Sequence, residues 1–133
     1  MQRSFFTWAS IFALTAVALG ALGAHALKSV LEPERLVSFE TGVRYQFYHA
    51  IAIFITSFAY AARPNALVKW AGWLFIAGIF CFSGSIYLLA GRQQLGIEHW
   101  SFLGPITPLG GLLFMAGWAL LLGGAWKKEG RKS

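Results

Sequence analysis

The side chains that could do chemistry gather in one ten-residue stretch, residues 40–49. This stretch holds a carboxylate, a guanidinium, two phenols, an amide and an imidazole, and it runs directly into the apolar residues 50–62. Ionisable groups near or inside a membrane are candidates for ligand binding or proton transfer, because burying them in lipid is costly. Polar side chains can equally form the hydrogen bonds that hold transmembrane helices together. The sequence leaves both interpretations open.

As a helix, this stretch would separate polar from apolar side chains. At about 100° per residue, Glu40, Arg44, Tyr45, Tyr48 and His49 fall on one half of the helix, and a narrow apolar stripe lies opposite. Glu40 and Arg44 are one turn apart, close enough to form an ion pair. We therefore expect the polar half to face other helices and the apolar stripe to face lipid.

The rest of the chain indicates a membrane protein. It has 133 residues, of which 57% are hydrophobic and only 12% charged, whereas charge is near a quarter in soluble domains. About 20 apolar residues in a helix span the hydrocarbon core of a bilayer. Four segments approach this length in one integral membrane domain, residues 1–133: 5–24, 46–62, 68–90 and 108–126. The first could alternatively be a cleaved signal sequence, since residues 24–26 have the small-x-small pattern of a cleavage site.

These segments predict an all-α fold, a four-helix transmembrane bundle with a short interfacial helix before the second span. Pro33 suits the first position of that short helix, because its missing N–H costs nothing there. Residues 63–65, Arg-Pro-Asn, predict a turn after the second span. Residues 95–106 are expected to form a loop among the lipid headgroups, with Thr107 capping the fourth span and Pro108 at its first position.

Glycines in the fourth segment recur every seven residues, at Gly110, Gly117 and Gly124. On a helix they form a smooth line that allows another backbone to approach closely, which is common between helices in lipid. The spacing is therefore a prediction of close packing that needs a structure to test it.

The distribution of positive charge predicts the orientation. Seven Lys and Arg residues fall at the N-terminus, the second connection and the tail, and four fall in the first and third connections. Since positive residues favour the cytoplasmic side, we expect both termini in the cytoplasm. The polar residues at the opposite ends of the spans should then share one level at the outer face. This candidate cluster, for ligand binding or for structure, comprises His25, Glu40, Arg44, Tyr45, Tyr48, His49, Ser83, Ser85, Tyr87 and Thr107.

Specific chemistries find little support in the sequence. Two histidines and a glutamate could ligate a metal, but no two histidines are three or four residues apart, so we expect no metal site. A hydrolase built from His49, Ser85 and Glu40 lacks a nucleophile elbow. No phosphate-binding loop or haem attachment motif is present, and we expect no cofactor. The formal charge of +6 owes much to a basic tail beside a span, which indicates lipid headgroups and no nucleic acid.

Four motifs resemble a widespread family. They are GALGAHAL at residues 20–27, ETGVRYQFYHA at 40–50, FSGSIY at 82–87 and ITPLGG at 106–111. The resemblance covers nearly the whole chain, and the family is the small multi-pass membrane proteins catalogued as domain of unknown function 423, with eukaryotic relatives called transmembrane protein 256. It implies a four-span protein of the bacterial inner membrane, and it implies no activity and no catalytic residues.

Two functions remain in view. The first is a non-enzymatic accessory or assembly role beside a membrane-protein partner or in a homo-oligomer. The second is binding or carriage of a small polar ligand or proton through the outer cluster. A membrane enzyme is the least supported class. Polar groups bonded to one another would favour the first function, and polar groups around a water-accessible cavity would favour the second.

Overall fold

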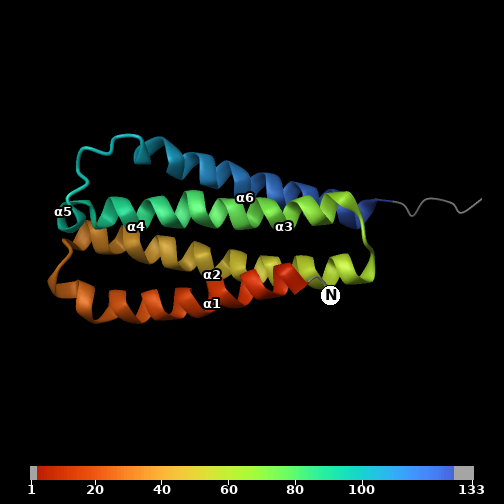
Figure 1. The fold of residues 1–133 in the computed structure, drawn as a ribbon, viewed down its shortest axis with the longest axis horizontal. Coiled ribbons are helices and arrows are strands. Elements are labelled where there is room, and N and C mark those ends of the chain that lie inside the picture. Colours follow the sequence, from red (N-terminus) through yellow and green to blue (C-terminus); the bar gives the residue numbers. More distant parts are fainter. Residues whose placement is uncertain (1–2, 128–133) are drawn as a thin grey trace, which may run out of the picture.

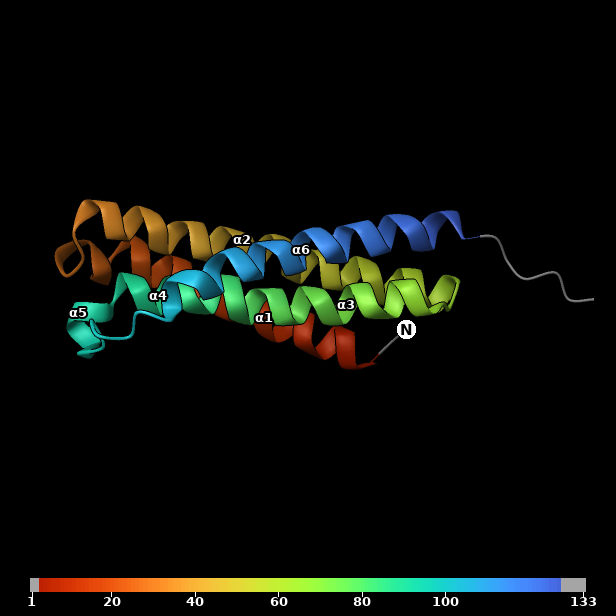
Figure 2. The ribbon, with the colours of Figure 1, turned by 90° about the horizontal axis from the view of Figure 1, so that it is seen from above.

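The structure, a computed structural model, describes residues 3–127, and its regular elements are all helical. Four long rods lie side by side, each antiparallel to the one before it in the chain (Figure 1), and the view from above shows the same arrangement (Figure 2). The elements are α1 (Arg3–Ala24), the 3-10 helix η1 (Ala26–Ser29), α2 (Pro33–Ala62), α3 (Ala66–Gly78), the π-helix η2 (Ile79–Gly84), α4 (Ser85–Ala90), α5 (Arg92–Leu95) and α6 (Leu103–Trp126). The elements α3, η2 and α4 follow one another without a break, and we call this segment, Ala66–Ala90, the third rod.

Three of the four rods are long and apolar enough to cross a membrane. They are Arg3–Ala24, Ala66–Ala90 and Leu103–Trp126, with mean hydropathies of 1.9, 1.9 and 1.7. The remaining rod, α2, has 30 residues, and five of the ten candidate polar residues lie on it. The expected all-α fold is confirmed, and the described chain provides three candidate membrane spans.

The prediction of a short, separate interfacial helix before the second span is wrong. Those residues are the first turns of α2, which runs unbroken from Pro33 to Ala62. At about 1.5 Å per residue a helix of this length measures about 45 Å, longer than a hydrocarbon core of about 30 Å. Gly42 does not interrupt it. Its missing side chain instead makes room for Tyr87, because a Cβ there would lie 2.8 Å from Tyr87 Cε1.

The expected start of the last helix is also wrong. α6 begins at Leu103, so Pro108 lies inside the helix and Thr107 does not cap it. A proline this close to the start removes one early hydrogen bond and opposes its ring to the carbonyl of Gly104, a residue with open space around it. The connection that precedes α6, residues 96–102, is therefore shorter than expected.

Hydrogen bonds hold the chain segments together at each end of the bundle. As expected, α2 ends at Ala62 and a turn follows, after which Asn65 Oδ1 accepts a hydrogen bond of 3.1 Å from Val68 N and caps α3. At this end Arg63 Nη2 also donates to the carbonyl of Lys127, at 3.0 Å. At the opposite end, which we call the loop end, Gln94 Nε2 donates to the carbonyl of Val30 at 3.2 Å.

The glycine line of α6 packs against the third rod, which confirms the prediction of close approach. A Cβ added at any of these three glycines would fall under 3.0 Å from an atom of that rod. The shortest distances from the added Cβ are 2.3 Å to Phe82 N at Gly110, 2.7 Å to Phe75 Cε1 at Gly117 and 2.6 Å to Val68 Cγ2 at Gly124. Similarly, the ring of Phe5 in α1 is fully buried over Gly72 of α3.

Candidate functional site

The ten candidate residues do not form one layer at the outer face. His25 follows the last turn of α1 at the loop end, whereas Glu40 and His49 are separated by nine residues, about 13 Å along the axis of α2. The structure divides them into two groups. Five candidates are buried or half-buried and form hydrogen bonds: His49, Ser83, Ser85, Tyr87 and Thr107. The other five are exposed: His25, Glu40, Arg44, Tyr45 and Tyr48.

The centre of the buried group is a residue outside the candidate list, Gln46. Its side chain is only 3% exposed, and its Nε2 donates to the carbonyl of Phe12 at 2.9 Å and to Thr15 Oγ1 at 2.8 Å. Its Oε1 accepts a hydrogen bond of 2.7 Å from the hydroxyl of Tyr87. The backbone carbonyl of Phe12 can only accept a hydrogen bond, so it fixes the orientation of the Gln46 amide. One side chain of α2 thus ties together α1, α2 and the third rod.

Two more hydrogen bonds join the third rod to its neighbours. Ser83, fully buried within η2, donates from Oγ to the carbonyl of Gly42 at 2.7 Å. The hydroxyls of Ser85 and Thr107 are hydrogen-bonded to each other, which joins α4 to α6. Because α6 starts five residues earlier than the sequence suggested, Thr107 is free to make this contact.

His49 joins α2 to α6 with both ring nitrogens occupied. Its Nδ1 lies 2.8 Å from the carbonyl of Tyr45, and its Nε2 accepts a hydrogen bond of 3.1 Å from Trp118 Nε1. A carbonyl only accepts and an indole N–H only donates, so the imidazole is neutral with its proton on Nδ1. The ring also stacks on Phe114, with centroids 3.6 Å apart and planes 9° from parallel. This arrangement leaves no free basic nitrogen on His49.

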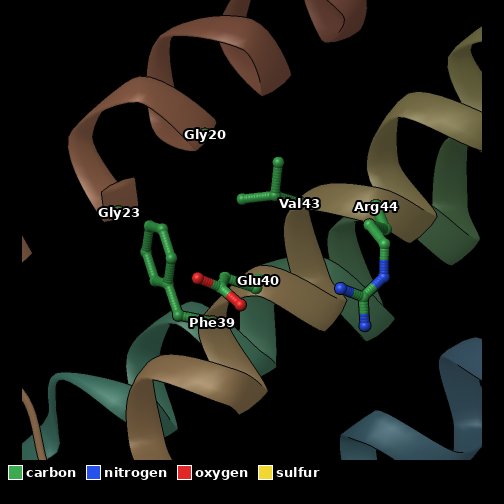
Figure 3. A pocket seen from close by; sticks show the side chains of 6 residues that line it. All are labelled: Gly20, Gly23, Phe39, Glu40, Val43 and Arg44. Carbon is green, nitrogen blue, oxygen red and sulfur yellow. The ribbon is translucent and has the colours of Figure 1, made fainter. Parts of the chain in front are cut away.

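Glu40 and Arg44 do not form the expected ion pair. Both are exposed, and Arg44 Nη2 instead donates to Thr41 Oγ1 at 3.2 Å. Their side chains line a groove of about 200 Å³ between α1 and α2, with Gly20, Gly23, Phe39 and Val43. Figure 3 shows the carboxylate and the guanidinium standing apart along the groove. An ion pair between exposed side chains contributes little, so nothing forces these two together.

The other exposed candidates stay outside the buried network. Tyr48 is 55% exposed. The ring of Tyr45 packs on Phe82, with centroids 4.8 Å apart, and helps to line a second groove, between α2 and α6. This groove has a volume of about 590 Å³ and is lined mainly by aromatic rings and by α6 residues from Pro108 to Trp118. Gly111 borders it with no atom within 4 Å of the position of an added Cβ.

Several partners in the network lay outside the candidate list, among them Gln46, Thr15, Trp118 and the carbonyls of Phe12 and Gly42. The sequence did carry a signal for Gln46, since a lone amide at the start of an apolar span needs a partner. Among residues 3–127 no three His, Cys, Asp or Glu side chains lie close enough to hold a metal ion.

The comparisons with known proteins agree with the resemblance noted in the sequence. The chain is 41% identical over 128 residues to the UPF0382 membrane protein YwdK of Bacillus subtilis (strain 168), covering 95% of this chain and 98% of that protein. It is 37% identical over 124 residues to the UPF0382 inner membrane protein YgdD of Escherichia coli (strain K12), covering 93% and 90%. No solved structure matches the chain. Residues 19–111 match the family described as "Protein of unknown function (DUF423)", and the chain belongs to this family of membrane proteins.

Proposed function

We propose that the chain crosses the bacterial inner membrane four times, with α2 as the fourth span and both termini in the cytoplasm. Three observations support this. α2 lies between α1 and the third rod and is bonded to both through Gln46. The relative in Escherichia coli is named an inner membrane protein. The bundle end that holds Arg63 and Lys127 carries more positive charge in the sequence than the loop end.

A reporter fused after the last residue tests this orientation. We expect alkaline phosphatase fused there to be inactive, because it folds to its active form only in the periplasm. Green fluorescent protein fused there should fluoresce, because it folds in the cytoplasm. The same reporters inserted in the connection 96–102 provide the matched control, with the opposite pattern expected. Active phosphatase at the C-terminus would contradict the proposed topology.

We further propose a non-enzymatic role as an accessory or assembly partner of another membrane protein. The observation that carries this proposal is that the buried polar side chains bond to one another. Gln46, Tyr87, Ser83 and His49 all have partners within the chain, so their polar groups serve the bundle. A carrier would need such groups directed into a cavity. The alternative function, binding a polar ligand or proton, therefore has less support.

The groove between α2 and α6 is the surface we propose for a helix of the partner protein. Close approach of two helices in lipid requires small residues at the contact, and Gly111 offers one with open space beside aromatic rings. The glycines at 110, 117 and 124 are not free for this purpose, because they already contact the third rod.

Affinity purification from native membranes, with two matched variants, tests this role. Gly111→Phe fills the groove, whereas Gly104→Phe adds the same ring to another glycine of α6 that also has open space but lies outside the groove. We expect one identified membrane protein to co-purify in constant ratio with the wild type and Gly104→Phe, and to be lost with Gly111→Phe. Retention by the wild type and both variants would contradict the groove as the contact, and co-purification of a small molecule alone would favour the ligand-binding alternative.

A further inference from the structure

A third groove lies at the loop end, where the first turns of α2 run beside the end of α4. It has a volume of about 340 Å³, and most of its exposed lining is polar. Its charged residues are two arginines, Arg35 and Arg92, and two glutamates, Glu32 and Glu34. The beginning of α2 and the end of α4 lie together at one end of the bundle (Figure 1). None of these four residues takes part in the buried network.

Arg35 is the unusual member of the groove. Its Nη1 is buried and has no hydrogen-bond partner within residues 3–127. A buried donor without an acceptor costs free energy, and more so when it is charged, so such groups call for an unseen ion, water or ligand. Neither Glu32 nor Glu34 forms an ion pair with it, although both line the same groove. A ligand bound in the groove would supply the acceptor that Nη1 lacks.

The position of the groove relative to the bilayer indicates where that acceptor comes from. Leu89 and Ala90, which also line it, are the last two residues of the apolar third rod. The end of an apolar span lies at the boundary between hydrocarbon and headgroups, and phospholipid phosphates lie at this level. Arginine binds phosphate well, because its planar fork of N–H donors matches the phosphate oxygens. A lipid phosphate can thus reach Arg35 and Arg92 from the bilayer.

The two carboxylates narrow the choice of lipid. The anionic headgroup of phosphatidylglycerol would bring a phosphate but no cation to Glu32 and Glu34. A headgroup with both a phosphate and a primary ammonium matches two arginines and two glutamates in charge. We propose that this groove binds the headgroup of phosphatidylethanolamine, with Arg35 and Arg92 on the phosphate and Glu32 and Glu34 on the ammonium. This inference goes beyond the accessory role and does not depend on it.

Native mass spectrometry of the purified full-length protein in detergent tests the proposal. The probes are phosphatidylethanolamine, phosphatidylglycerol and phosphatidylcholine with identical acyl chains, and inorganic phosphate. We expect phosphatidylethanolamine to bind most tightly, because phosphatidylglycerol has no cation and the quaternary ammonium of phosphatidylcholine has no N–H to donate. Arg35→Gln should weaken its binding about tenfold, as expected for loss of a charge-assisted hydrogen bond.

Lys28→Gln is the matched control, because Lys28 is an exposed cation at the same end of the bundle but does not line the groove. It should bind phosphatidylethanolamine like the wild type. A second variant, Glu34→Gln, should reduce the preference for phosphatidylethanolamine over phosphatidylglycerol, and it provides a readout if Arg35→Gln fails to fold. Equal affinities for the three lipids, unchanged affinity in both groove variants, or inorganic phosphate binding as tightly as the lipid would overturn the assignment.

Discussion

Gly110→Ala is expected to lose most of its folded protein, with a cost of about 3 kcal/mol, at the upper end for overpacking. The added Cβ would lie 2.3 Å from Phe82 N and 2.7 Å from Phe82 Cα, both backbone atoms of the third rod. A flexible side chain could rotate away, but a backbone can yield only if α6 and the third rod move apart. Thermal unfolding of the purified protein in detergent, followed by circular dichroism, measures the loss.

Gly111→Ala is the matched control, one residue further along the same helix. An added Cβ there meets no atom within 4 Å, so the substitution should leave stability unchanged or raise it by about 0.5–1 kcal/mol, because alanine favours a helix over glycine. If the two variants unfold at the same temperature, the contact between α6 and the third rod is looser than in the structure.

Gln46→Leu is expected to cost about 3 kcal/mol, since it removes three hydrogen bonds worth about 1 kcal/mol each between helices in lipid. The change leaves the Tyr87 hydroxyl without its acceptor and removes the link from α2 to the carbonyl of Phe12. The side-chain volume is nearly conserved, so the loss measures the hydrogen bonds and not a cavity. Unfolding in detergent with increasing dodecyl sulfate gives the free energy directly.

A double-mutant cycle separates the contributions. Tyr87→Phe removes only the hydroxyl that Gln46 accepts from, so the two substitutions together should cost less than the sum of each alone. The exposed Gln93 of α5 supplies the control substitution Gln93→Leu, which should change stability by no more than about 0.5 kcal/mol. Additive costs at 46 and 87 would mean that the amide and the phenol act independently.

Local sequence signals predicted much of the fold. Long apolar runs predicted three of the rods, because each carries enough apolar residues to span a bilayer whatever its neighbours are. The turn at residues 63–65 followed from proline and asparagine chemistry. The seven-residue glycine spacing predicted close packing, since glycines at that interval lie on nearly the same side of a helix.

Helix limits and polar partners were less predictable, because they depend on contacts distant in sequence. Pro108 indicated a helix start, but α6 begins five residues earlier and places Thr107 against Ser85, 22 residues away. Gln46 reaches a backbone carbonyl 34 residues away, and no side-chain pattern marks which carbonyl it will find. Glu40 and Arg44 had suitable spacing to pair, yet spacing alone does not hold two solvated charges together.

The π-helical turn Ile79–Gly84 sets the rotational phase of everything after it in the third rod. Such a turn contains one residue more than an α-helical turn, so the following residues point about 100° away from where a regular helix would direct them. Ser85 and Tyr87 meet Thr107 and Gln46 only in this phase. The length of this segment is therefore as constrained as its composition: shortening it by one residue would turn α4 away from both neighbours, although every side chain of α4 itself would stay the same.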